Sequence, residues 1–175
     1  MQVRQCLMFH SIIIREDTIK TRSKTIKAPQ FSLHDQNGVL RTNNDYLGKW
    51  LIIYFYPKDD TPGCTKEACN FRDGREVLSQ MGAEIVGISK DTVDSHSKFI
   101  NKHDLNFTLL ADPDHSTIEA FGSWVPKKFM GKSYVGINRD TYLIDPKGMI
   151  VKKYEDVDPK SHIKDIMSDL KELSV

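Results

Sequence analysis

The residues of this chain with the clearest capacity for chemistry are two cysteines five positions apart, Cys64 and Cys69. Cys64 follows Thr61, Pro62 and Gly63 at an expected junction between a strand and a helix. Thr61 suits the N-cap of that helix, and Pro62 suits its first position, where a missing N–H costs nothing. A cysteine in a first helical turn lies among free backbone N–H groups at the positive end of the helix dipole, which stabilise a thiolate. This position predicts a nucleophile at Cys64.

Other uses of the thiols fit less well. Most free cysteines are small buried apolar side chains, and for Cys69 that reading stays open. A dithiol-disulfide oxidoreductase would need Cys-x-x-Cys, whereas four residues separate these two cysteines. A zinc site would need four clustered ligands, and the six histidines show no metal spacing with the cysteines. We therefore expect no metal and no cofactor.

The elements that must position Cys64 alternate between strands and helices. The apolar run 51–56 directly before it is rich in β-branched and aromatic residues and is closed by Pro57, which predicts a buried strand. Turn signals, caps and apolar periodicity predict the remaining elements. These are a hairpin of 31–33 and 39–41, strands at 84–89, 107–110, 141–144 and 149–154, and helices from about 92 to 102, 116 to 121 and 159 to 173.

Three segments, in order, resemble the peroxiredoxins. Pro57-x-x-x-Thr61-x-x-Cys64 is similar to the active-site signature of that family, and residues 56–69 resemble its bacterioferritin comigratory protein (Q-type) branch. The similarity continues at 28–33 and 136–145, and it covers roughly Thr25 to Leu173. The expected element order agrees with the fold that this resemblance implies, an α/β thioredoxin-like three-layer sandwich with an N-terminal β-hairpin extension.

The resemblance implies a role for each matching residue. Cys64 would be the peroxidatic thiolate and Cys69 the resolving thiol, while Thr61 would donate to the peroxide and Pro57 would shield the thiolate from water. Arg139 matches the arginine that faces the peroxidatic sulfur in this family. It lies between the apolar stretches 134–137 and 141–144, where a permanent cation needs a partner.

Residues beside these positions have more than one interpretation. Glu67 matches the branch motif and would orient Arg139, although a surface acid near a helix N-terminus is the alternative. Asn138 and Asp140 stand where Glu and a small hydroxyl residue are more usual in the branch, which leaves the local charge balance open. Asp59 and Asp60 are expected to be solvated loop residues without a chemical role.

The implied reaction is the reduction of hydrogen peroxide and organic hydroperoxides. Cys64 would become a sulfenic acid, condense with Cys69 to an intramolecular disulfide, and be regenerated by thioredoxin or a similar dithiol protein. The alternative is a redox-sensing binding protein that signals through its oxidised form. On a regular helix, residues five apart have Cα atoms roughly 8.6 Å apart, whereas a disulfide tolerates about 4.4 to 6.8 Å. The helix must therefore unwind locally, with Gly63 and Gly74 as candidate weak points, although Gly74 could instead be a tolerated surface residue.

Composition and charge indicate the number of domains, the kinds of partner and the cellular compartment. The chain has 175 residues, is 39% hydrophobic and carries a net charge of +1, which fits one domain and gives no reason to expect nucleic-acid binding. We expect residues 1–24 to be a poorly ordered basic extension and 25–175 to be the enzyme domain. The apolar run 6–14 lacks a small-residue cleavage site and is too short to span a bilayer, so neither export nor a membrane is expected. Three cysteines without an export signal favour the cytoplasm, and a monomer is expected, with a weak dimer as the alternative.

Overall fold

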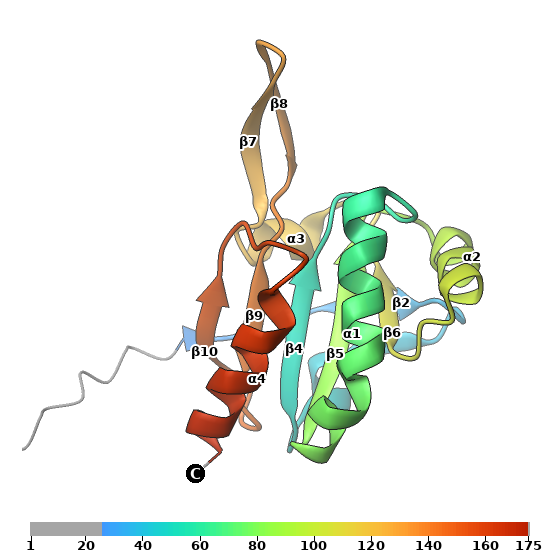
Figure 1. Ribbon diagram of the computed structural model, residues 1–175. Helices are drawn as coiled ribbons and strands as arrows, with labels where there is room; N and C mark the ends of the chain where they lie inside the picture. Colours follow the sequence, from blue (N-terminus) through green and yellow to red (C-terminus); the bar gives the residue numbers. More distant parts are fainter. Residues whose placement is uncertain (1–25, 175) are drawn as a thin grey trace, which may run out of the picture.

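A mixed eight-stranded sheet forms the centre of the molecule (Figure 1). The computed structural model describes residues 26–174, so Cys6 and the expected extension 1–24 lie outside the described residues. The strand order is β1-β10-β9-β4-β5-β6-β2-β3, and a separate two-stranded sheet joins β7 to β8. The strands are β1 (Ile26–Lys27), β2 (Ser32–Asp35), β3 (Leu40–Thr42), β4 (Trp50–Phe55), β5 (Ala83–Ser89), β6 (Thr108–Ala111), β7 (Trp124–Phe129), β8 (Lys132–Ile137), β9 (Thr141–Ile144) and β10 (Met149–Tyr154).

Helices cover both faces of the sheet, which makes three layers. They are the short 3-10 helix η1 (Asn43–Tyr46) and the α-helices α1 (Pro62–Gln80), α2 (Val93–His103), α3 (Ser116–Ala120) and α4 (His162–Leu173). One core cluster joins side chains of α1, α2 and α4 to Ile52, Tyr54 and Tyr56. The other joins α3 to Leu51, Ile53 and Phe55. Because successive side chains of a strand point to opposite faces, the run 51–56 supplies both cores, and the predicted fold class is confirmed.

Strand β4 positions the segment that carries Cys64. It pairs in parallel with β5 and antiparallel with β9, so it lies inside the sheet with partners on both sides. Its six residues are buried apart from the half-buried Trp50. The chain leaves β4 at one end of the sheet and enters α1 within seven residues, at the upper end of the molecule in Figure 1. A rigid strand therefore fixes the start of the loop that leads to Cys64.

Gly74 lies at a close contact between α1 and α4. A Cβ atom at this position would stand 2.3 Å from Cδ1 of Ile163 and 3.0 Å from Cε of Met167. Both atoms are the ends of flexible side chains, so a larger residue at position 74 would require Ile163 and Met167 to shift. Gly74 packs against α4 and is therefore not a plain surface residue, whereas its role as a weak point of the helix stays a prediction.

Two further expectations differ from the structure. Helix α4 begins at His162, not near 159, because the backbone N–H groups of Ser161 and His162 both donate to the Asp158 carbonyl in a turn. The hairpin β7–β8 was not expected, and it stands away from the body of the molecule in Figure 1. Phe129 and Met130 at its tip are 68% and 87% exposed, and burial is confined to the base of the hairpin at Ile137, so its strands show no alternating pattern.

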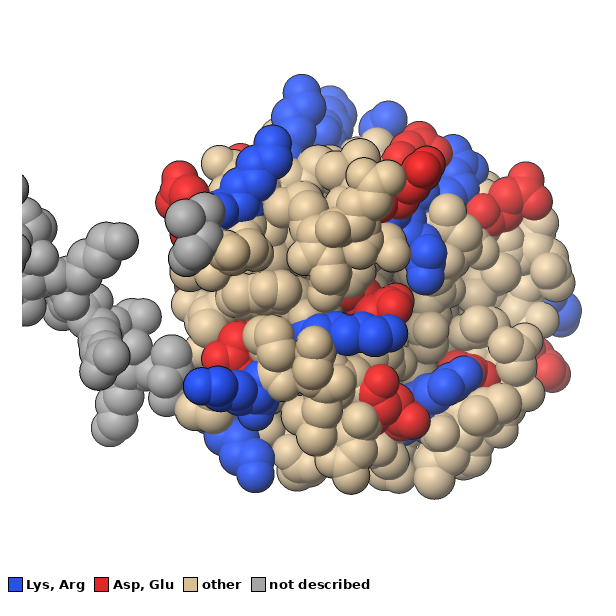
Figure 2. Space-filling view, turned by 90° about the horizontal axis from the view of Figure 1, so that it is seen from below, with Lys and Arg blue, Asp and Glu red and all other residues tan. Residues whose placement is uncertain are grey.

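Charges of both signs share the surface. Figure 2 shows lysines and arginines interspersed with acidic residues on the face seen from below, with no large area of one sign. This distribution agrees with the small net charge and gives no sign of a polyanion-binding face there. Within residues 26–174, no helix combines the length and the apolar character that crossing a bilayer requires.

Candidate active site

Cys64 is the third residue of α1 and is 1% exposed. Thr61 is the N-cap and Pro62 the first helical residue, as the sequence predicts. The N–H groups of Gly63 and Cys64 belong to the first turn, where a helix offers no backbone acceptor four residues earlier. The thiol thus lies at the positive end of a 19-residue helix, beside backbone donors that an anionic sulfur or a peroxide oxygen can use.

Arg139 reaches Cys64 from the segment between β8 and β9. Its Nη2 donates to the Cys64 Sγ at 3.5 Å, and its Nη1 donates to Oε2 of Glu67 on α1. Its side chain is 17% exposed and that of Glu67 is 2% exposed, so the ion pair is largely shielded from water. A Cβ at Gly63 would lie 3.3 Å from the Arg139 Nη2, which shows how closely the guanidinium approaches the helix start.

Asp140 fixes the backbone that carries Arg139. Its carboxylate is 1% exposed and accepts from the Ser123 hydroxyl at 2.9 Å and from the Asn138 side-chain amide at 2.6 Å. Its carbonyl accepts from the N–H of Phe55, the last residue of β4, at 2.8 Å. The two residues that depart from the usual branch pattern therefore hydrogen-bond to each other. They tie the Arg139 segment to the strand that leads to Cys64.

The Glu67 carboxyl group is strongly affected by its surroundings. Burial raises the pKa of Glu67 to about 7, while the attraction of Arg139 opposes that rise. One of its oxygens, Oε1, is buried and has no hydrogen-bond partner among the described residues. Glu67 is therefore no surface acid, and the ion pair with Arg139 places it where it can orient the guanidinium.

We expect the unfolding free energy to fall as the pH rises between about 4.5 and 7, because of Glu67. The folded protein holds the Glu67 proton in this range while the unfolded chain has released it, so raising the pH favours unfolding. Glu67→Gln should remove this part of the pH dependence of the unfolding free energy. Urea unfolding of both proteins across this pH range measures the difference between their unfolding free energies. Contributions of other titrating groups, such as His162, are common to both proteins and cancel in that difference. If the unfolding free energy of the variant changes with pH as steeply as that of the wild type, Glu67 is not the group responsible.

The hydroxyl of Thr61 has a different partner from the one that capping requires. It donates to the carbonyl of Lys58 at 3.0 Å, and no backbone N–H donates to it. The expected side-chain capping bond is therefore wrong, although Thr61 does occupy the N-cap position. The hydroxyl bond closes the loop just before the helix, and the donation of Thr61 to a peroxide stays a prediction.

Pro57 is exposed at the end of β4. It lines a pocket of about 240 Å³ together with Lys90, Trp124, Lys127, Tyr134, Gly136 and Ile137. Cys64 does not line this pocket. The shielding of the thiolate by Pro57 thus stays a prediction, and the structure adds that the base of the β7–β8 hairpin lies beside the proline.

Cys69 is half-buried on the same regular helix as Cys64, and both are free thiols. Because both residues lie on one regular helix, their Cα atoms stand roughly 8.6 Å apart. This distance is too long for a disulfide. Next to Cys69, the side-chain amide of Asn70 donates to the carbonyl of Pro159 at 2.6 Å. Unwinding of this turn would break that link between α1 and the start of α4.

Asp59 and Asp60 are not simply solvated. Asp59 is 7% exposed, its carboxylate accepts from the hydroxyls of Tyr56 and Ser95, and its Oδ2 lies 2.9 Å from the His96 Nδ1. Asp60 contacts Lys102 and His103 through its carboxylate. The expectation for Asp59 is therefore wrong. Sequence reasoning missed its role because its partners on α2 are more than 35 residues away, and no local pattern marks them.

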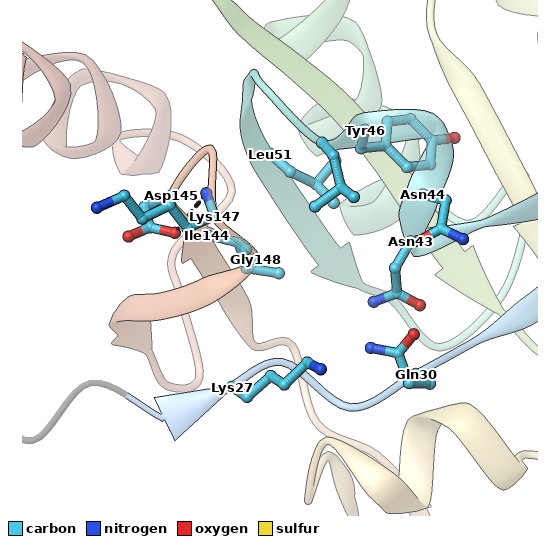
Figure 3. A pocket seen from close by; sticks show the side chains of 11 residues that line it. Lys27, Gln30, Asn43, Asn44, Tyr46, Leu51, Ile144, Asp145, Lys147 and Gly148 are labelled. Atoms are coloured by element: carbon cyan, nitrogen blue, oxygen red, sulfur yellow. Dashed lines mark hydrogen bonds between the residues drawn. The ribbon is translucent and has the colours of Figure 1, made fainter.

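Another pocket, of about 200 Å³, lies at the opposite end of β4 (Figure 3). It is lined by Lys27, Gln30, Leu51 and neighbours from η1 and from the turn after β9. Part of the polar lining already serves the fold, since Asp145 accepts from the N–H groups of Lys147 and Met149, and Asn43 bonds both Phe31 and Pro29. The hydroxyl of Tyr46, which also lines the pocket, is buried without a hydrogen-bond partner among the described residues. In the described part of the chain, no group of three or more His, Cys, Asp or Glu is placed to hold a metal ion.

Comparison with known proteins shows the family to which the chain belongs. The family model described as AhpC/TSA family matches residues 25–153. Peroxiredoxin Bcp of Bacillus subtilis is 45% identical over 148 residues, which are 85% of this chain and 94% of that protein. Peroxiredoxin Bcp of Escherichia coli is 45% identical, covering 83% and 93%. The fold is similar to that of the bacterioferritin comigratory protein of Xanthomonas campestris, studied for alkyl peroxide reduction (TM-score 0.79, 35% identity, 83% and 92% covered). It is also similar to a Xylella fastidiosa PrxQ variant (0.80, 30%, 87% and 99%).

Proposed function

The chain belongs to the AhpC/TSA family as a Bcp-type peroxiredoxin, and from that premise we propose that Cys64, Cys69, Thr61, Arg139 and Pro57 carry out its peroxidase reaction. The observation that supports this assignment best is the contact between the Arg139 Nη2 and the Cys64 Sγ at the start of α1. A buried thiol, a permanent cation and free helix N–H groups meet there. The substrate is a hydroperoxide and the electron donor is a thiol.

In the first step the Cys64 thiolate attacks one oxygen of the peroxide. The S–O bond forms as the O–O bond breaks, and its electron pair goes to the departing oxygen, which takes a proton and leaves as water or an alcohol. Sulfur is thereby oxidised by two electrons to a sulfenic acid. Arg139 and the N–H groups of the first turn lie where they can hold the peroxide and stabilise the negative charge on the departing oxygen.

Ionisation of the thiol alone is a small part of this catalysis. A thiol with a pKa of about 8.5 is already roughly one-tenth thiolate at pH 7.5, so complete ionisation adds about tenfold at most. Lower basicity also reduces intrinsic nucleophilicity. A larger acceleration must come from alignment of the O–O bond with sulfur and from charge stabilisation by Arg139, Thr61 and backbone donors.

In the second step Cys69 attacks the Cys64 sulfenic acid, a disulfide forms and water leaves. A dithiol protein of the thioredoxin type then reduces the disulfide by two electrons and restores both thiols. We propose hydrogen peroxide and organic hydroperoxides as substrates, and a monomeric enzyme in the cytoplasm. The reducing conditions there would keep both cysteines free between cycles.

Steady-state peroxide consumption tests the proposal. With thioredoxin, thioredoxin reductase and a nicotinamide reductant, we expect many turnovers per enzyme with hydrogen peroxide and with an organic hydroperoxide. A redox sensor would instead undergo one stoichiometric oxidation followed by capture of a partner. A single equivalent consumed under these conditions would therefore contradict the enzyme assignment.

Disulfide formation should remove helical structure locally. We expect oxidation to reduce amide hydrogen-exchange protection from Thr65 to Phe71 and to leave 52–55 in β4 protected, because the five-residue separation on α1 is too long for the bond. The measurement compares reduced and oxidised protein, with the Cys64–Cys69 bond verified by mass spectrometry. Full protection of 65–71 in the verified disulfide form would show that α1 does not need to unwind.

A further inference from the structure

The loop between β4 and α1 is attached to α2 by its two aspartates. Asp59 bonds Ser95 and His96 near the start of α2, and Asp60 bonds Lys102 and His103 at its end. The Asp59 side chain is 5% exposed and that of His96 is 0% exposed, whereas those of Asp60 and Lys102 are 43% and 61% exposed. The loop therefore has one buried and one solvated attachment to the same helix, and the buried one is the stronger constraint.

We propose that Asp59 and His96 form a buried latch that positions the active-site loop for attack by Cys64, an inference that rests on the proposed function. The His96 Nδ1 lies 2.9 Å from Asp59 Oδ2, and its Nε2 lies 3.1 Å from the Leu110 carbonyl on β6. A carbonyl can only accept, so Nε2 carries a hydrogen. Both ring nitrogens thus face acceptors, and a proton must lie between Nδ1 and the carboxylate.

The remaining bonding sites of the Asp59 carboxylate are also used. Oδ1 accepts from the Tyr56 hydroxyl at 2.7 Å, and Oδ2 accepts from the Ser95 hydroxyl at 2.7 Å. The backbone N–H of Asp59 donates to Asp91 Oδ2 at 2.8 Å. One aspartate therefore joins β4, the segment before α2 and α2 itself. Such a buried and fully satisfied polar network gives a loop one well-defined position.

The latch is close to the reacting atoms along the chain. Asp59 follows Lys58, whose carbonyl accepts the Thr61 hydroxyl, and the carbonyl of Thr61 accepts from Thr65 in the first turn of α1. Asp60, between them, has a left-handed backbone with φ of 56°, a conformation that needs tertiary support. If Asp59 moves, Thr61 and the start of the Cys64 helix move with it. Misplacement by about 1 Å can cost about 100-fold in rate.

Asp59→Ala tests the latch. Asp59 and His96 do not touch the sulfur or the peroxide, so they are positioning residues, and the readout is the second-order rate constant for Cys64 oxidation in stopped flow. We expect it to fall by about 10- to 100-fold. The rate of the later disulfide step should change by less than about threefold, since Cys69 lies beyond the loop. Asp59→Asn, which can bond a neutral His96 and both hydroxyls, should recover most of the oxidation rate.

Lys102→Gln is the matched control, because it removes a solvated contact of the same loop with the same helix and should change the rate by less than about threefold. A purely structural role would lower the urea midpoint of Asp59→Ala and leave the oxidation rate of the folded protein unchanged, which would overturn the latch.

Amide exchange of the reduced proteins gives a readout that needs no peroxide. Protection of the Asp59 and Thr65 N–H groups should fall in Asp59→Ala, and unchanged protection there would also overturn the latch. Failure of the wild type to consume peroxide, with protection still lost in the variant, would count against the proposed function alone.

Discussion

Cys64→Ser should abolish peroxide consumption. A serine hydroxyl stays protonated at neutral pH, so it cannot supply the anionic nucleophile, and no other described thiol occupies a helix start beside a guanidinium. We expect the rate in the thioredoxin-coupled assay to fall to the level without enzyme. Because serine is nearly isosteric with cysteine, the urea midpoint should move little, which separates the loss of chemistry from a loss of fold.

Cys69→Ser is the matched control for that variant. It keeps Cys64 and its contacts, so one equivalent of peroxide should still be consumed at the wild-type rate, and a trapping reagent should detect the sulfenic acid. Turnover with thioredoxin should then stop, because no disulfide can form within the chain. Retained turnover in Cys64→Ser would overturn the nucleophile assignment, and retained thioredoxin-linked turnover in Cys69→Ser would overturn the resolving role.

Arg139→Met should slow Cys64 oxidation by about 100-fold, the effect of removing one preorganised donor from a developing oxyanion. Loss of ionisation explains at most about tenfold of this effect. The measurement is stopped-flow oxidation over a pH series that extends until the ultraviolet absorbance shows full thiolate. We expect the deficit to persist there, because Arg139 also holds the peroxide and the departing oxygen.

The decisive comparison in that experiment is made at high pH. If the variant reaches the wild-type rate once its thiol is fully ionised, Arg139 acts on ionisation alone and the charge-stabilisation argument is wrong. Because removing Arg139 leaves Glu67 buried without its partner, Arg139→Met combined with Glu67→Gln serves as the structural control. The double variant should show the same deficit in a better-folded protein.

The sequence identifies the centre of this fold well and its edges less well. Strand β4 and the start of α1 are predictable because a six-residue apolar run, a proline and a capping residue all lie within a few positions of one another. The β7–β8 hairpin is not, because its strands contain Pro126 and several lysines and are buried only at Ile137. Local patterns report burial, and this hairpin is mostly exposed.

The site divides in a similar way. Cys64 and Thr61 can be found from local spacing, and Arg139 from the resemblance together with its apolar flanks. Asp59 and His96 cannot, because a buried pair 37 positions apart has no local signature until the helix that carries one partner is placed. Asp140 attracts notice in the sequence only because it departs from the residue that is usual in the branch. Its role depends on contacts with Ser123 and Phe55, which only the fold reveals.

We expect the contact of Gly74 with α4 to divide the helix that carries Cys64 into two units that open separately. Residues before Gly74 can unwind for the disulfide, while those after it, including the fully buried Leu78, stay packed against the closing helix and the sheet. Each catalytic cycle then draws on the free energy of a local opening and leaves the global free energy of unfolding intact. Substitutions at an exposed position of the unwinding segment, such as Lys66, can therefore tune how fast the enzyme turns over, and substitutions beyond 74 can tune its lifetime in the cell.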